Sequence, residues 1–142
     1  MTGRVQQMTT IALAAAVLSA ASFSAPAAQS VALRDDQVLT DGLVTAAIGN
    51  RIRRGCDTIS PRVFRALGYL NSLKARAQGL GYSEPEIRAF LEDPAEKDRI
   101  DAIVDGWLAA RGTSRHDGPG LCRVGAEEIA KNSPVGRLLR MN

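Results

Sequence analysis

The sequence predicts an all-α protein, a compact bundle of five or six short helices stapled by one disulfide. Three observations support this fold class. Apolar residues recur at three- and four-residue spacings in several stretches, which is the period of a helix buried along one face. These stretches begin at capping residues and mostly end near a glycine. No stretch alternates apolar and polar residues with a period of two, so no sheet is expected.

The first helix is expected from about residue 36 to residue 54. Asp35 and Asp36 stand where an N-cap belongs, and Gly55 follows a basic last turn, which is typical of a helix C-terminus. Gly42 and Gly49 weaken the helix locally, or else they allow another helix to approach closely. The apolar face consists of Val38, Leu39, Leu43, Val44, Ala47, Ile48 and Ile52.

The second helix is expected to start at Ser60-Pro61, because an N-cap serine followed by a first-turn proline is a helix-start signal. Gly79 and Gly81 bracket the end of this helix. Its apolar residues are Val63, Phe64, Leu67, Leu70 and Leu73, with Ala77 below them.

Two further helices follow local capping motifs. Ser83-Glu-Pro-Glu86 has the spacing of a capping box and precedes a short third helix with Ile87, Phe90 and Leu91. Asp93-Pro-Ala-Glu96 repeats this logic for a fourth helix, which stops at Gly112. A solvent-facing tryptophan would not share the spacing of an apolar stripe, so Trp107 is expected in the core. The stripe of the fourth helix is Ile100, Ile103, Val104, Trp107 and Leu108.

Residues 112–121 are rich in glycine around one proline and are expected to form a loop, with Cys122 directly after it. A short fifth helix is expected over about residues 125–132, anchored by Ile129 and Ala130. Ser133-Pro134 then caps a last turn or two that include Val135, Leu138 and Leu139.

Residues 1–27 have the features of a secretory signal peptide. Arg4 and the α-amine supply positive charge, and an apolar run of about 11 residues follows, from Ile11 to Ala21. Such a run is too short to cross a hydrocarbon core of about 30 Å as a helix. An uncleaved membrane anchor is the alternative interpretation.

Cleavage is expected in the region of Ala25, Ala27 and Ala28, because Ala25-Pro-Ala27 fits an A-x-A site. Residues 28–142 then form a single α-helical domain, which we expect to be periplasmic or secreted. This domain has no second long apolar run, so no transmembrane segment is expected after cleavage.

Cys56 and Cys122 are expected to form a disulfide, because an even pair of cysteines in an exported chain is oxidised by default. The bridge would close a loop of about 65 residues and tie the end of the first helix to the start of the fifth. A redox pair is one alternative, since Arg53 and Arg54 could lower a thiol pKa, but there is no Cys-x-x-Cys motif. A metal site that adds His116 is another. We expect no metal and no cofactor.

The charge balance argues against a nucleic-acid partner. Removal of Arg4 with the signal peptide leaves 17 basic residues of the 18, against 15 acidic residues, which is a net charge of +2. Helix dipoles and solvation explain the arginines around the turn between the first two helices, and an anion or lipid-headgroup site is the alternative. These arginines are Arg51, Arg53, Arg54, Arg62 and Arg65.

Acidic residues gather between positions 84 and 105, and paired carboxylates could carry out glycoside hydrolysis. Most of them fit simpler roles at helix starts or in i,i+4 pairs on an exposed face. His116 lies in the glycine-rich loop with no G-x-S-x-G motif in the chain, so we assign no catalytic residue. The acidic residues are Glu84, Glu86, Glu92, Asp93, Glu96, Asp98, Asp101 and Asp105.

Several stretches together resemble a known family pattern: GYSEPEIRAF at 81–90, DPAEKDR at 93–99, LCRVGAEEI at 121–129, SPVGRLL at 133–139 and IRRGCDTISPR at 52–62. The pattern is similar to that of an uncharacterised group of small exported proteins from Gram-negative bacteria, known only as a domain of unknown function. This resemblance covers nearly all of residues 35–140. It implies an α-helical exported protein with two matched cysteines, and it supplies no catalytic residue.

The function that fits these features is non-enzymatic: a periplasmic envelope protein that binds another protein or an envelope component. A small periplasmic hydrolase that uses the acidic cluster near residues 84–105 is the first alternative. A small disulfide-stabilised periplasmic chaperone is the second, on architectural analogy alone. An exposed apolar patch would favour the binding protein, whereas two converging carboxylates with a raised pKa would favour the enzyme.

Overall fold

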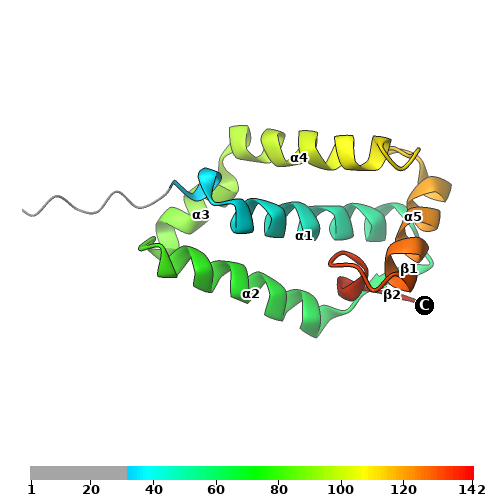
Figure 1. Cartoon of the computed structure of the whole chain (residues 1–142), viewed down its shortest axis with the longest axis horizontal. Helices are drawn as coiled ribbons and strands as arrows, with labels where there is room; N and C mark the ends of the chain where they lie inside the picture. The colour runs from blue at the N-terminus through cyan, green and yellow to red at the C-terminus, as the bar shows by residue number, and fades with distance from the viewer. Residues whose placement is uncertain (1–31) are drawn as a thin grey trace, which may run out of the picture.

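Within residues 32–142, five α-helices, two short 3-10 helices and one pair of short strands make up the fold (Figure 1). The computed structural model describes residues 32–142, so the expected signal peptide and the cleavage region at Ala25, Ala27 and Ala28 lie outside the described residues. The prediction of an all-α bundle stapled by one disulfide is confirmed. The elements are η1 (Leu33–Asp35), α1 (Gln37–Gly55), β1 (Ile59–Pro61), α2 (Val63–Gly79), α3 (Glu84–Glu92), α4 (Pro94–Ala109), α5 (Gly118–Ala130), η2 (Gly136–Leu138) and β2 (Leu139–Met141).

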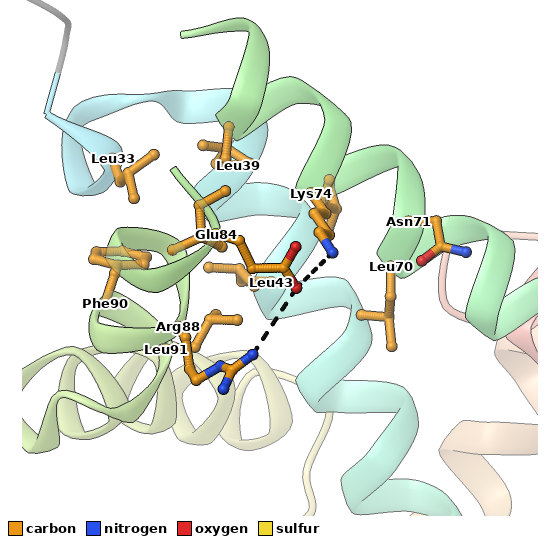
Figure 2. A pocket seen from close by; sticks show the side chains of 13 residues that line it. Leu33, Leu39, Leu43, Leu70, Asn71, Lys74, Glu84, Arg88, Phe90 and Leu91 are labelled. Carbon is orange, nitrogen blue, oxygen red and sulfur yellow. Dashed lines mark ion pairs between the residues drawn. The ribbon is translucent and has the colours of Figure 1, made fainter. Parts of the chain in front are cut away.

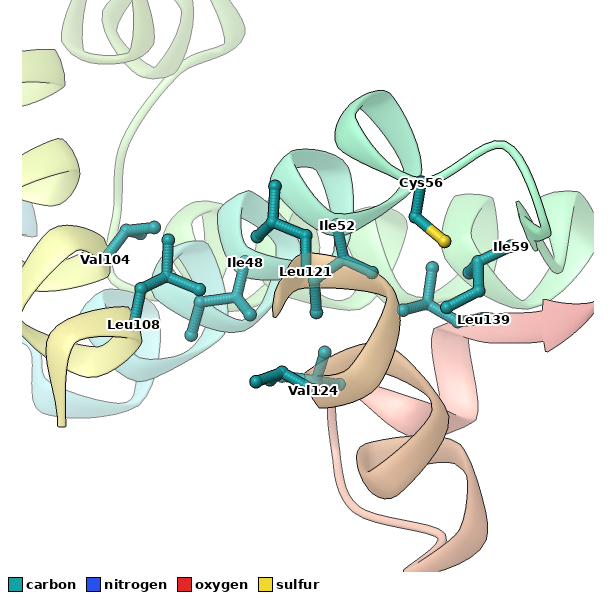
Figure 3. Close-up of a cluster of buried hydrophobic side chains, with 10 residues drawn as sticks. Ile48, Ile52, Cys56, Ile59, Val104, Leu108, Leu121, Val124 and Leu139 are labelled. Carbon is teal, nitrogen blue, oxygen red and sulfur yellow. The ribbon is translucent and has the colours of Figure 1, made fainter. Parts of the chain in front are cut away.

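Helix α1 is the centre of the arrangement, because α2 and α4 lie on either side of it and α5 packs across its C-terminal end (Figure 1). Ile48 and Ile52 of α1 are almost completely buried. Figure 3 shows how side chains from α1, α4, α5 and both strands meet there. The buried residues of this main core are Ile48, Ile52, Cys56, Ile59, Val104, Leu108, Leu121, Val124, Val135 and Leu139.

A second, smaller core lies at the other end of α1, where η1, α2 and α3 come together. Gly42 of α1 packs directly against Leu73 of α2, because a Cβ added to Gly42 would overlap the Leu73 side chain. The sequence predicts such a close helix contact as one role for Gly42. The buried residues of this second core are Leu33, Leu39, Leu73, Ala77 and Ile87.

The predicted capping residues start α1, α3 and α4. The Asp36 carboxylate accepts a hydrogen bond from the Leu39 amide at 2.8 Å, and Asp93 accepts one from the Ala95 amide at 2.7 Å. Ser83 begins α3 in a capping box with Glu86. Each of these contacts satisfies backbone N–H groups that have no partner within the first turn of a helix.

The predicted start of the second helix at Ser60-Pro61 is wrong. Residues 59–61 form β1, which pairs antiparallel with β2, so that Ile59 faces Met141 and Pro61 faces Leu139. Helix α2 begins two residues after Pro61, with Arg62 at the N-cap position. The partner strand is about 80 residues away in sequence, so no local pattern at Ser60-Pro61 could indicate the pairing.

The predicted loop over residues 112–121 is also wrong in its second half. Helix α5 starts at Gly118, with Pro119 in its first turn and Asp117 accepting a hydrogen bond from the Gly120 amide at 3.0 Å. An aspartate N-cap followed by a proline is a helix-start signal, which the neighbouring glycines concealed. Cys122 therefore lies inside α5 and not before it.

The apolar stripe of α4 is only partly buried. Val104 and Leu108 are completely enclosed, whereas Ile103 is exposed. Trp107 is partly buried and packs against the main core, and the Arg111 guanidinium lies 3.5 Å from the centre of its ring. Trp107 is thus at the border of the core, with a cation covering part of its exposed face.

Candidate functional site

The N-terminal half of α2 carries an apolar face that stays largely exposed to solvent. Val63, Leu67 and Leu70 follow one another at helical spacing and are 55%, 53% and 46% exposed, and Phe64 beside them is 91% exposed. A stripe of this kind ordinarily packs against a core. Leu73 and Ala77, in the C-terminal half of α2, are buried in the second core, and Tyr69 packs beside them.

The exposure follows from the path of the chain. Helix α2 diverges from α1 toward the strands. There the C-terminal segment of the protein lies between α1 and α2 (Figure 1). Leu138 and Leu139 of that segment border the space between α1 and α2. Val63, Leu67 and Leu70 therefore line a hollow between α1 and α2 and belong to neither core.

An apolar groove runs between α1 and α2, and we call it the α1/α2 groove. Its first part, about 300 Å³, lies beside α3 and is lined by apolar side chains of all three helices, including Leu43, Leu70 and Leu91 (Figure 2). Its second part, about 570 Å³, lies nearer the strands and is lined by Ala47 and Leu67 among others. Leu70 borders both parts and so makes them one continuous surface.

Charged side chains stand at the mouth of the groove. The Lys74 ammonium lies 2.8 Å from the Glu84 carboxylate, and the Arg88 guanidinium lies 4.0 Å from the same carboxylate (Figure 2). The hydrogen bond and the charge of Lys74 hold the pKa of Glu84 below its usual value of 4.5. Glu84 is therefore ionised at neutral pH and links α3 to α2 across the groove.

Two residues of the acidic cluster act at helix starts. Glu86 accepts hydrogen bonds from the Ser83 hydroxyl at 2.6 Å and the Ser83 amide at 2.7 Å, which lower the pKa of Glu86. Asp93 caps α4, as described above. Both carboxylates thus have the capping role that the sequence predicts.

Three other acidic residues form ion pairs with arginines. Glu96 is buried between Arg34 and Arg99. Asp101 lies 3.1 Å from Arg51. Asp105 accepts a hydrogen bond from Arg115 Nε at 2.9 Å, and this contact lowers the pKa of Asp105. A glycosidase needs a carboxylic acid whose pKa is raised, whereas the contact with Arg115 lowers the pKa of Asp105.

The five arginines near the first interhelical turn divide into two groups. Arg51 forms its ion pair with Asp101. Within residues 32–142, no carboxylate forms an ion pair with Arg53, Arg54, Arg62 or Arg65. Arg62 instead donates a hydrogen bond to the Leu139 carbonyl at 2.8 Å.

Cys56 and Cys122 form the predicted disulfide, with their Cα atoms 5.1 Å apart. Cys56 is the C-cap of α1 and is almost completely buried, and Cys122 lies in the second turn of α5. The bridge therefore fixes α5 across the end of α1. His116 is exposed in the connection between α4 and α5.

A family model, described as a family of unknown function (DUF5333), matches residues 31–140 of the chain. The chain belongs to this family. The matched range includes all five α-helices, both cysteines and the α1/α2 groove. No curated protein and no solved structure gives a significant match. The match thus confirms the resemblance to a domain of unknown function, and it names no activity.

The α1/α2 groove is the feature that sequence reasoning missed. Val63, Leu67 and Leu70 have the spacing of a core stripe, so the pattern alone does not distinguish a buried face from an exposed one. One local signal was available, because α2 contains no acidic residue at all. An ordinary solvent-exposed helix face mixes charges of both signs.

Proposed function

We propose that this protein is a non-enzymatic binding protein of the cell envelope and that the α1/α2 groove is its binding surface. The observation that supports this is the exposure of Val63, Phe64, Leu67 and Leu70 beside an apolar groove. Soluble monomers rarely leave a continuous apolar patch of this kind uncovered unless it binds something. The stripe and the groove lie next to one another, so a ligand could contact both.

The carboxylates give less support to a hydrolase. Glu86 and Asp93 cap helices, and Asp105 is held ionised by Arg115. A general acid would need the opposite shift of its pKa. No observation of this structure favours the hydrolase or the chaperone, and both stay predictions without further support.

The proposed location is the periplasm of a Gram-negative bacterium, reached by way of the signal peptide expected at residues 1–27. Support comes from the Cys56–Cys122 disulfide, because such bonds persist in oxidising compartments. In residues 32–142, no helix is both long enough and apolar enough to cross a bilayer. N-terminal sequencing of the exported protein should then find its first residue between about positions 22 and 30, and an intact Met1 would contradict cleavage.

Photo-crosslinking in intact cells tests the groove. A benzophenone amino acid at Leu70 of the full chain should form an adduct with an envelope component after illumination, because Leu70 borders both parts of the groove. The same amino acid at Lys131 is the matched control, since Lys131 is exposed at the end of α5, outside the groove. Adducts are resolved by electrophoresis and identified by mass spectrometry.

A second substitution shows whether an adduct depends on the groove. Leu67→Asp places a charge on the exposed stripe without removing a buried group, so the fold should persist while the adduct at Leu70 disappears. Equal adducts at Leu70 and Lys131, or an adduct that Leu67→Asp leaves unchanged, would show that the α1/α2 groove is not the binding surface.

A further inference from the structure

Charge is divided unequally along this chain. Residues 84–105 contain eight acidic residues and three basic ones, Arg88, Lys97 and Arg99. Residues 42–83 show the reverse, with Asp57 as their one acidic residue. The seven basic residues of that stretch are Arg51, Arg53, Arg54, Arg62, Arg65, Lys74 and Arg76. The exposed apolar face of α2 belongs to the basic stretch.

Arginines that form no ion pair within residues 32–142 flank this apolar face on two sides. Arg53 borders the α1/α2 groove together with Val63 and Leu67. On the other side, Arg62, Arg65 and Arg140 surround a hollow next to Phe64. None of these four arginines has an ion-pair partner among residues 32–142, and all four are exposed. Their positive charge is therefore available to an external anion.

We propose that the N-terminal half of α2 docks on an anionic lipid surface, with its apolar face inserted among the headgroups and its flanking arginines bound to the lipid phosphates. This inference rests on the proposed function and names the envelope component. A helix with an apolar face and a basic border lies in the plane of such an interface. Attraction to anionic lipids then adds to the burial of the apolar side chains.

The shape of the surface favours a lipid layer over a folded partner protein. Phe64 is 91% exposed, so its ring projects from α2 and does not line the adjoining groove. A lipid layer accepts a projecting aromatic ring without a preformed pocket, and aromatic rings are favoured at the level of the headgroups. Helix α2 itself has no acidic residue that anionic lipids would repel. The one acidic residue of the basic stretch, Asp57, lies in the turn between α1 and β1.

Flotation with lipid vesicles tests the proposal on the purified chain. Vesicles made of equal parts phosphatidylglycerol and phosphatidylcholine should bind the protein, and vesicles of phosphatidylcholine alone should bind it at least tenfold more weakly. Raising the salt from about 0.1 M to about 1 M shortens the screening length from about 10 Å to about 3 Å. That change should release most of the bound protein.

Four variants locate the contact. Phe64→Ser should weaken binding to the anionic vesicles about tenfold, and Arg65→Gln should weaken it about fivefold. Ile103→Ser is the matched control for the first, because Ile103 is an exposed apolar residue on α4. Lys131→Gln is the matched control for the second, since it removes one exposed cation from the end of α5. Both controls should bind as the unaltered chain does.

Several outcomes would overturn the inference. They are an absence of binding to the anionic vesicles, equal binding to both vesicle types, and equal losses in the variants and their controls. A dimer that Phe64→Ser dissociates would assign the surface to a second copy of the chain and also overturn it. Crosslinking at Leu70 to a protein, without vesicle binding, would refute the lipid surface and leave the proposed function intact. Failure of both experiments would refute both.

Discussion

Replacement of both cysteines, Cys56→Ser together with Cys122→Ser, is expected to lower the free energy of unfolding by about 4 kcal/mol. The disulfide joins residues 66 apart in sequence, so its loss restores conformational freedom chiefly to the unfolded chain. It also releases α5 from the end of α1. Urea denaturation of the variant and of the unaltered protein measures the difference, which is a large part of the 5–15 kcal/mol or so that stabilises an ordinary domain.

A second pair of substitutions separates the loss of the bridge from the burial of a new polar group. Cys56 is almost completely buried, and a serine there places a hydroxyl in the core. Cys56→Ala with Cys122→Ala leaves no such hydroxyl, and it should still cost a few kcal/mol. If the alanine variant is as stable as the unaltered protein, the disulfide does not stabilise the fold.

Thiol labelling distinguishes a structural bridge from a redox pair. A structural disulfide resists reduction at glutathione potentials, whereas a catalytic one is reduced readily. The native protein should therefore stay unlabelled across a glutathione series. Labelling near the potential of glutathione, together with an unchanged melting temperature of the double variant, would favour the redox alternative.

Ile52→Ala is expected to destabilise the protein by about 2–5 kcal/mol. Ile52 is 0% exposed and lies in the main core, where α1 meets α5 and the strands (Figure 3). Its side chain also contacts the position where a Cβ on Gly125 of α5 would stand. Removing its outer carbons leaves a cavity. To fill that cavity, two helices and a strand would have to move at the same time.

Ile103→Ala is the matched control, because it removes the same atoms from a side chain that is 40% exposed. We expect it to cost less than about 1 kcal/mol, since solvent already occupies much of its surroundings. Chemical denaturation of both variants gives the two values. Equal losses at the two positions would show that the main core is not centred where α1, α4 and α5 meet.

The features of this protein that depend on residues close together in the sequence could be predicted from the sequence. Asp36, Ser83 and Asp93 start helices because each caps backbone groups two or three residues further on. The glycine at position 55 ends α1 as expected. The Cys56–Cys122 pairing followed from a simple count, because two cysteines in an oxidised chain have one possible partner each.

The α1/α2 groove could not be predicted from spacing. Val63, Leu67 and Leu70 repeat at the period of a buried face, and that period states only that the residues share one side of a helix. Whether that side is covered depends on the distance from α2 to α1. The C-terminal segment sets this distance by entering between the two helices, and it comes about 70 residues later in the sequence.

The sequence by itself therefore determined the helical class, most of the helix starts and the disulfide, because caps and cysteine pairing act through local geometry or through a forced choice. Only the tertiary structure decided that residues 59–61 form a strand and that the apolar face on the N-terminal half of α2 stays exposed. Strand pairing and burial are set by segments that are distant in sequence, and folding alone brings those segments together. The surface proposed to bind lipid is exposed for the same reason, since the C-terminal segment borders it without burying Val63, Phe64 or Leu67.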